Sequence, residues 1–248
     1  MFECDNISKD IRVLFMTSIM KKYGYFIASA VLLLIFIVFT ILVKTIDVHY
    51  YYNNTYVGFY SINYKFGEFV TNFGKYEIMG KFSDIILYLS FGYILILLVF
   101  AIIELVKAKS FKKLNINYYV ALGGYVLTAV LYLVFEVVKV NYSPDSVIDK
   151  LKPSYPSSHV FIGCMFYLIN TFTAMKLLKP EKDWIKPITF LATGIICILL
   201  VFTRALSAKH WLTDLIASII LVSATYTLFI GVSKKLAPEE PKIIESEE

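Results

Sequence analysis

Six long apolar runs constrain the fold of this chain more than any other feature of its sequence. They cover roughly residues 23–46, 84–106, 118–138, 158–178, 187–203 and 211–232. Each run is long enough for a helix to cross the roughly 30 Å of hydrocarbon in a bilayer. We therefore predict an all-α, polytopic membrane protein whose six transmembrane helices form one bundle.

The composition supports a membrane protein and argues against several other classes. Hydrophobic residues make up 58% of the 248 residues and charged residues only 17%, whereas soluble domains average about 25% charged. The net charge of +5 comes from lysines scattered between the apolar runs, which is not the basic stripe of a nucleic-acid-binding protein. Cys4, Cys164 and Cys197 have no metal-type spacing, so we expect no metal, disulfide framework or cofactor.

The distribution of basic residues predicts the orientation in the membrane. The first 22 residues and the short loops after the second and fourth runs are rich in lysine, and such segments stay in the cytoplasm. We expect a cytoplasmic segment over 1–22, a transmembrane domain over 23–232 and a disordered cytoplasmic tail over 233–248. The first run lacks a signal-peptide cleavage site and should remain as a helix of a cytoplasmic-membrane protein.

A tyrosine-rich segment over residues 47–82 separates the first two runs. Tyrosines gather at membrane–water interfaces, so this segment should lie along the membrane surface. Residues 66–73 are predicted to form a short interfacial helix. The pattern leaves open whether the segment covers a functional site.

Arg204, His210 and Asp214 lie where the last two runs meet, and burial of ionisable groups at membrane depth is costly and usually functional. His210 and Asp214 are four residues apart and would share a helix face. A carboxylate can fix the tautomer of a nucleophilic imidazole, and the guanidinium of Arg204 matches phosphate oxygens. Alone, the stretch fits equally well an Arg–Asp pair and an interfacial histidine that hold two helix ends together.

A second polar stretch, Pro156-Ser157-Ser158-His159, begins the fourth run. Free backbone N–H groups at a helix start form an anion site, and a histidine in the first turn could protonate a leaving oxygen. The alternative is an ordinary helix cap beside a surface histidine. Because both stretches fall on the same face of the membrane, we favour a single phosphate-handling site with His159 and His210 together.

These stretches resemble two motifs of the type 2 phosphatidic acid phosphatase superfamily. Pro156 to His159 resembles Pro-Ser-Gly-His, and Thr203 to Asp214 is similar to Ser-Arg-x5-His-x3-Asp, with threonine in place of serine. Their order and membrane placement also agree, so the resemblance spans at least residues 84–232. Further features resemble a Gram-positive bacterial branch, namely Val57-Gly58-Phe59, Phe135-Glu136, Asn141-Tyr142, Ser154-Tyr155 and His210-Trp211-Leu212-Thr213-Asp214.

The resemblance implies a metal-independent phosphatase that works through a phosphohistidine. His210 would attack phosphorus, Asp214 would orient it, and His159 would protonate the leaving oxygen before water releases phosphate. Fixed donors are needed where charge develops in the transition state. The same resemblance implies that these donors are Arg204, Ser157 and the amide of Ser158.

The first motif of the family, Lys-x6-Arg-Pro, is not matched. Aligned on Pro144, the chain has Glu136 in place of the lysine and Ser143 in place of the arginine. Glu136 could instead be a structural partner of Lys139 or Arg204. The missing cations could be replaced by Lys139, Lys150 or Lys152, although these lysines equally fit solvated or headgroup-facing positions.

The function predicted from these patterns is hydrolysis of a lipid phosphate or lipid pyrophosphate at the outer face of the membrane. Diacylglycerol-type phosphates and polyprenyl pyrophosphates such as undecaprenyl pyrophosphate fit equally well. A phosphotransferase would use the same intermediate with another hydroxyl acceptor. A noncatalytic lipid-binding or transport protein is the alternative favoured by the altered first motif. A channel or ion-coupled transporter lacks the expected broken spans and inverted repeat.

Overall fold

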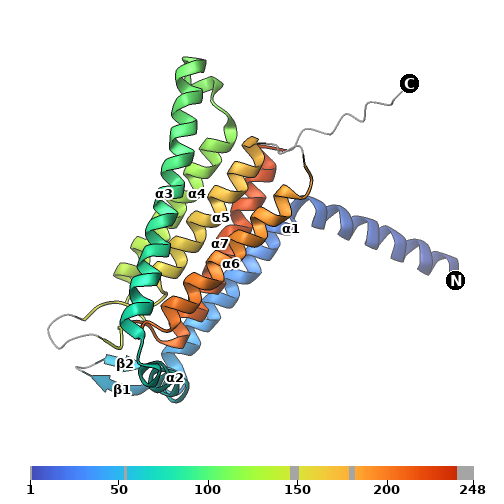
Figure 1. The fold of residues 1–248 in the computed structure, drawn as a ribbon. Coiled ribbons are helices and arrows are strands. Elements are labelled where there is room, and N and C mark those ends of the chain that lie inside the picture. Colours follow the sequence, from blue (N-terminus) through green and yellow to red (C-terminus); the bar gives the residue numbers. More distant parts are fainter. Residues whose placement is uncertain (1, 53–54, 146–150, 179–181, 239–248) are drawn as a thin grey trace, which may run out of the picture.

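A computed structural model describes residues 2–52, 55–145, 151–178 and 182–238, with the backbone alone for 2–19 and 21. Within these ranges, six helices are long and apolar enough to cross a membrane, and they pack as one bundle (Figure 1). The predicted all-α membrane fold is therefore confirmed. The helices are α1 (Phe2–Thr45), α3 (Tyr76–Ala108), α4 (Ile116–Val137), α5 (Ser158–Leu178), α6 (Ile185–Ala205) and α7 (Leu212–Leu236).

The centre of the bundle is α5, with α7 beside it. Two-thirds of the apolar window of α5 is buried (67%), against 11% for α6, whose outer face carries side chains suited to lipid. Close packing around α5 depends on Gly124 of α4, where a Cβ atom would lie 2.9 Å from Ile169 and Phe229. A glycine lets two helix backbones approach in this way. The polar site described below is built on the ends of α5 and α7.

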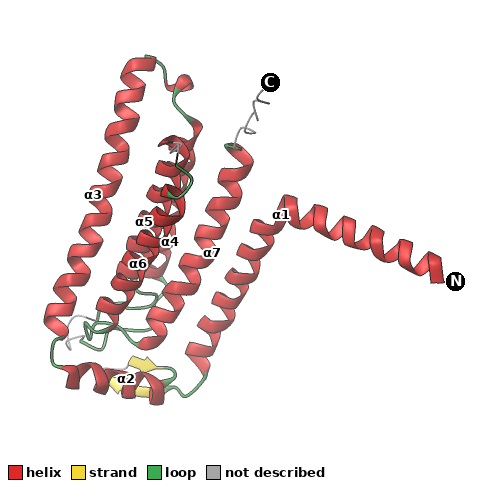
Figure 2. Ribbon diagram, turned by 45° about the vertical axis from the view of Figure 1, so that its right-hand side comes forward, coloured by secondary structure: helices red, strands yellow, loops and turns green. Residues whose placement is uncertain are grey.

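The sequence predicts the last four helices to within a few residues, but three boundaries differ. The first helix begins at Phe2 and is continuous through the predicted cytoplasmic segment, and its N-terminal part bends away from the bundle (Figure 2). The second begins at Tyr76 instead of residue 84, and the last ends at Leu236. Hydropathy marks where a helix meets hydrocarbon, and a helix can continue into water at either end. Residues 239–248 of the predicted tail lie outside the described residues.

The tyrosine-rich segment folds into a hairpin and a helix. The strands β1 (His49–Tyr52) and β2 (Thr55–Val57) pair antiparallel, and α2 (Tyr60–Phe73) follows. The predicted helix over 66–73 therefore begins earlier, at Tyr60. Gly58 joins the two parts where the chain passes α1 so closely that a Cβ atom would lie 1.7 Å from the carbonyl oxygen of Val43. Only glycine fits such an approach.

All the loops that carry the predicted site lie at one end of the bundle. The hairpin and α2 cover that end, beside the loops that precede α5 and α7 (Figures 1 and 2). The two motifs therefore lie at the same end, as the sequence predicts. The outward orientation of this end stays a prediction from the lysine distribution.

Asn63 of α2 fixes this cover to the bundle. Its fully buried side chain donates to the carbonyl oxygen of Gly58 at 2.8 Å and to Oγ1 of Thr213 at 3.0 Å. Its Oδ1 accepts from the backbone N–H of Thr213 at 3.2 Å. Sequence reasoning did not single out this residue, because an asparagine in a polar segment carries no signal of its burial.

We expect Asn63→Leu to lower the free energy of unfolding by about 2–4 kcal/mol, because unsatisfied buried groups on Gly58 and Thr213 cost about 1–3 kcal/mol each. Thermal unfolding in detergent measures this effect. The control is Lys65→Gln, an exposed position on the same helix, which should leave stability unchanged. Equal stability of the two variants would show that α2 is not held through Asn63.

Candidate active site

His210 lies in the loop between α6 and α7 and is only 7% exposed. Its Nδ1 is 3.0 Å from the backbone carbonyl oxygen of Ser154. Since a carbonyl oxygen can only accept, Nδ1 carries the hydrogen and Nε2 presents its lone pair. Nε2 is buried and has no hydrogen-bond partner among the described residues. This is the arrangement that a nucleophilic imidazole requires.

Asp214 is fully buried in the first turn of α7. Its Oδ1 accepts from Asn141 Nδ2 at 3.0 Å, and its Oδ2 accepts from the backbone N–H of Trp211 at 3.1 Å. The sequence predicts that Asp214 orients His210, but Oδ2 is 3.7 Å from Nδ1, so the nearer acceptor is the carbonyl of Ser154. Asp214 therefore acts on His210 by its charge and by holding the intervening turn.

The surroundings of His210 keep the ring neutral. Burial lowers the pKa of His210 below its usual 6.5 and the positive charge of Arg204 lowers it further, whereas Asp214 and the Ser154 carbonyl raise it less. An unprotonated Nε2 is thereby maintained at neutral pH.

The lowered pKa of His210 predicts a pH-dependent stability. As pH falls below about 6.5, His210 becomes protonated in the unfolded chain but stays neutral in the folded protein. Acidification therefore lowers the free energy of unfolding. We expect the melting temperature of the wild type to fall more steeply between pH 7 and 5 than that of His210→Gln. Parallel profiles of the two proteins would contradict this account.

Arg204 and His159 meet at a carboxylate from a third helix. Arg204 ends α6 and is 6% exposed, and its Nη1 lies 3.7 Å from Oδ1 of Asp84. His159 Nε2, in the first turn of α5, lies 3.0 Å from the same oxygen. The sequence analysis treated Asp84 only as the boundary of an apolar run. In the structure Asp84 lies within α3 and not before it. A carboxylate inside a membrane helix would have indicated a functional residue.

Ser157 links the two motifs. Its backbone N–H donates to the carbonyl oxygen of Asp214 at 3.3 Å, and its own carbonyl accepts from Oγ of Ser218 at 3.2 Å. The helix α5 begins at the next residue, Ser158, as predicted. The start of α5 is thus fixed directly against the first turn of α7.

Buried polar atoms without partners gather at this junction. Such atoms are rare in folded proteins and call for an explanation. Apart from Nε2 of His210 they are donors suited to an oxyanion, and they come from three separate loops or helix ends. At the junction they are Ser154 Oγ, Ser157 Oγ, Arg204 Nε, Arg204 Nη1 and His210 Nε2, and Ser83 Oγ of α3 is a further such atom in the described chain. Together they are the kinds of group that could hold a tetrahedral anion beside the imidazole of His210.

A cavity of about 480 Å³ opens beside His210. Its walls come from α2, the hairpin and the loops before α5 and α7, so the tyrosine-rich segment covers the site. It falls within the range of small-molecule pockets, about 300–1,000 Å³. Its lining includes Tyr51, Tyr64, Glu68, Tyr76, His210 and Trp211.

Comparison with known proteins identifies the family. Residues 118–236, from α4 to the end of α7, match the model of the PAP2 superfamily. Over this part of its length, the chain is similar to the PAP2 superfamily. The family predicted from the two motifs is thus confirmed. No curated protein matches the chain in sequence.

A solved structure shares the PAP2 fold. It is a transmembrane PAP2-type phosphatidylglycerolphosphate phosphatase from Bacillus subtilis, a Gram-positive bacterium. The match has a TM-score of 0.63 and 18% sequence identity, and it covers 86% of this chain and 99% of that one. This likeness extends the common fold beyond the family match to most of the chain.

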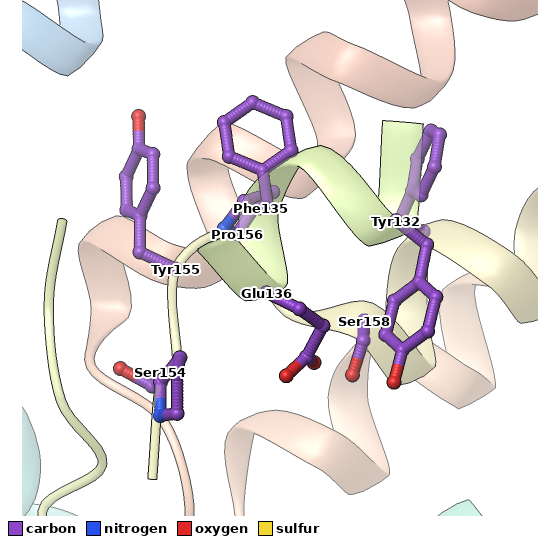
Figure 3. Close-up of a pocket in the computed structure, with 9 residues that line it drawn as sticks. Tyr132, Phe135, Glu136, Ser154, Tyr155, Pro156 and Ser158 are labelled. Carbon is purple, nitrogen blue, oxygen red and sulfur yellow. The ribbon is translucent and has the colours of Figure 1, made fainter. Parts of the chain in front are cut away.

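The altered first PAP2 motif lies beside the site without contributing a cation. Ser143 is buried, and its Oγ lies within hydrogen-bond distance of two acceptors for its one proton, the carbonyl oxygen of Lys209 at 2.7 Å and the carboxylate of Asp145. It therefore anchors the loop that precedes His210. Glu136 lies on the other side of the loop before α5, where its carboxylate, Ser158 and Tyr132 direct their polar ends the same way (Figure 3).

Two of the lysines proposed as replacements, Lys139 and Lys152, have exposed side chains. Lys139 follows α4, and the backbone carbonyl of Lys152 accepts from Ser143 N–H at 2.9 Å. Lys150 lies outside the described residues. Arg204 is paired with Asp84, so Glu136 is not the partner of Arg204 that the sequence allowed.

Proposed function

We propose that this protein is a lipid phosphate phosphatase that transfers a phosphoryl group first to His210 and then to water. The observation that carries the proposal is the buried, unpaired Nε2 of His210 beside unpaired donors of Arg204 and Ser157. A tetrahedral phosphoryl group satisfies all of these atoms at once. Similarity to the PAP2 superfamily supports the same reaction.

The reaction follows from the two histidines. The lone pair of His210 Nε2 forms a bond to phosphorus, while the bond from phosphorus to the ester oxygen breaks and that oxygen takes a proton from His159. His159 then accepts a proton from water as the water oxygen attacks the phosphohistidine. The P–N bond breaks, its electron pair returns to Nε2, and inorganic phosphate leaves.

The charge that develops on the phosphoryl oxygens is stabilised by fixed donors. Arg204 supplies the guanidinium, Ser157 the hydroxyl, and Ser158 the amide at the N-terminus of α5, where the helix dipole favours anions. Lys139, Lys150 and Lys152 are proposed to attract anionic lipid to this end of the bundle, since in the sequence all three lie between α4 and α5.

The substrate is a phosphorylated lipid of the cytoplasmic membrane, hydrolysed at its outer face. Six apolar helices embed the site at the membrane surface, and the lysine distribution supports outward orientation of its loops. The proposed transmembrane domain covers 23–232, with cytoplasmic segments over 1–22 and 233–248. Phosphatidylglycerolphosphate, the substrate named for the matched structure, is one candidate, and phosphatidic acid and undecaprenyl pyrophosphate are others.

A noncatalytic lipid-binding protein is the second candidate. It is favoured by Glu136 and Ser143, which replace two cations of the first PAP2 motif with a carboxylate and a structural hydroxyl. Against it stands the unsatisfied state of His210 and Arg204. Buried groups without partners cost stability, and a protein that only holds lipid has no use for an imidazole lone pair in this state.

The test is phosphate release from phosphatidic acid, phosphatidylglycerolphosphate and undecaprenyl pyrophosphate by purified protein in detergent, with and without a metal chelator. We expect release from at least one lipid at a rate that the chelator does not change. Binding of these lipids without any turnover would instead establish the noncatalytic alternative. Transfer of phosphate to an added alcohol would identify a phosphotransferase.

A further inference from the structure

We infer that Asp84 makes this site selective for phosphate monoesters of lipid alcohols over lipid diphosphates, by holding His159 as the proton donor to an alcohol oxygen. The inference rests on the proposed phosphatase function and narrows its substrate class. Asp84 lies in α3, outside residues 118–236 that match the family model. The structure alone therefore brings this residue to the site.

One carboxylate oxygen of Asp84 lies close both to the proposed proton donor, His159, and to the proposed phosphate-binding residue, Arg204. Oδ1 of Asp84 lies 3.0 Å from Nε2 of His159 and 3.7 Å from Nη1 of Arg204. A hydrogen bond of this length fixes the orientation of the His159 ring on the first turn of α5. Nδ1 of His159 makes no hydrogen bond to the described residues, and it is the nitrogen left to face a leaving oxygen.

The charge of Asp84 suits an alcohol as leaving group. Burial of His159 and the charge of Arg204 favour the neutral ring, and the carboxylate of Asp84 opposes both by favouring the protonated ring, which is the form that donates a proton. An alkoxide is a strong base and leaves only with a proton, whereas a phosphate leaving group needs little help because its conjugate acid has a pKa of about 6. The Asp84–His159 pair therefore assists the hydrolysis of a monoester much more than that of a diphosphate.

The same charge opposes a diphosphate directly. In a lipid diphosphate the leaving group is itself a phosphate, which would lie at His159 and so next to the carboxylate of Asp84. Like charges at such a distance repel strongly in a partly buried site. Asp84 is about one-third exposed (34%), so solvent screens this repulsion only in part. Arg204 Nη1 lies 3.7 Å from the same carboxylate, but the transferred phosphoryl group shares its charge, so Arg204 offsets this repulsion only in part.

The experiment compares farnesyl monophosphate with farnesyl diphosphate, which share one prenyl chain, in the wild type, Asp84→Asn and Asp84→Glu. We expect the wild type to prefer the monophosphate in kcat/KM. Asp84→Asn should lower kcat for the monophosphate by about 10²-fold, the scale of general acid catalysis, and leave the diphosphate rate unchanged or raised. Asp84→Glu should retain part of the preference. Glu77→Gln, an exposed acidic position on the same helix, is the control and should change neither rate.

Three results would overturn the inference while phosphate release by the wild type still supports the proposed function. The first is a wild type without preference for the monophosphate. The second is an equal loss on both substrates in Asp84→Asn, which would make the residue structural. The third is a faster Asp84→Asn with tighter inhibition by inorganic phosphate, which would show that the carboxylate competes with substrate for Arg204. Absence of release by every protein would remove the proposed function and the inference with it.

Discussion

His210→Gln should lower phosphate release by at least about 10⁴-fold, because the loss of a nucleophile in a catalytic unit has effects of this size or larger. Glutamine can still donate a hydrogen bond to the Ser154 carbonyl that now accepts from Nδ1. It cannot form the covalent intermediate, since an amide has no basic lone pair. The loop between α6 and α7 should therefore keep its position while the reaction stops.

Two measurements separate this chemical role from a structural one. Wild type incubated with ³²P-labelled substrate and quenched in alkaline detergent should carry a base-stable, acid-labile phosphate, and His210→Gln should carry none. The matched control is His49→Gln, since His49 has an exposed side chain on β1 and pairs with Asp47 at 3.1 Å. Labelling that persists in His210→Gln, or activity within tenfold of the wild type, would exclude this histidine as the nucleophile.

The bundle could be predicted from sequence because one physical rule dominates it. A backbone in hydrocarbon must satisfy its own hydrogen bonds, so a long apolar run becomes a helix. The rule is silent outside the hydrocarbon, which is why the start of α3 at Tyr76 and the hairpin before α2 were not predicted. These parts depend on contacts between distant residues, such as Asn63 with Thr213.

The candidate site was predicted in part for a similar reason. His159, Arg204, His210 and Asp214 are unusual enough near apolar runs to be noticed singly. The groups that hold them are not: the Ser154 carbonyl is a backbone atom, and Asn141 and Asp84 are ordinary polar residues until the fold places them. No spacing rule connects Asp84 to His159, because α4 and two loops intervene.

Arg204→Gln should lower kcat/KM by about 10²–10³-fold, the usual effect of removing a fixed donor from a developing anion. The effect should lie at the upper end of this range, since Glu136 and Ser143 stand where the PAP2 family pattern has cations. Arg204→Lys should recover only part of the loss, because an ammonium keeps the charge without the planar fork that matches two phosphate oxygens. Inhibition by inorganic phosphate should weaken in the same order.

Stability should move in the other direction, and this separates a functional arginine from a structural one. Arg204 is buried, and within the described chain its Nε and Nη1 have no hydrogen-bond partner, although Nη1 lies 3.7 Å from Asp84. Burying a charge with incomplete hydrogen bonding costs folding free energy. Arg204→Gln should therefore melt at the same temperature as the wild type or higher, despite its loss of activity. Lys75→Gln, exposed at the same end of the bundle, should change neither property. A large fall in melting temperature in Arg204→Gln would instead mean that the arginine holds α6 to α3 through Asp84, with phosphate binding secondary.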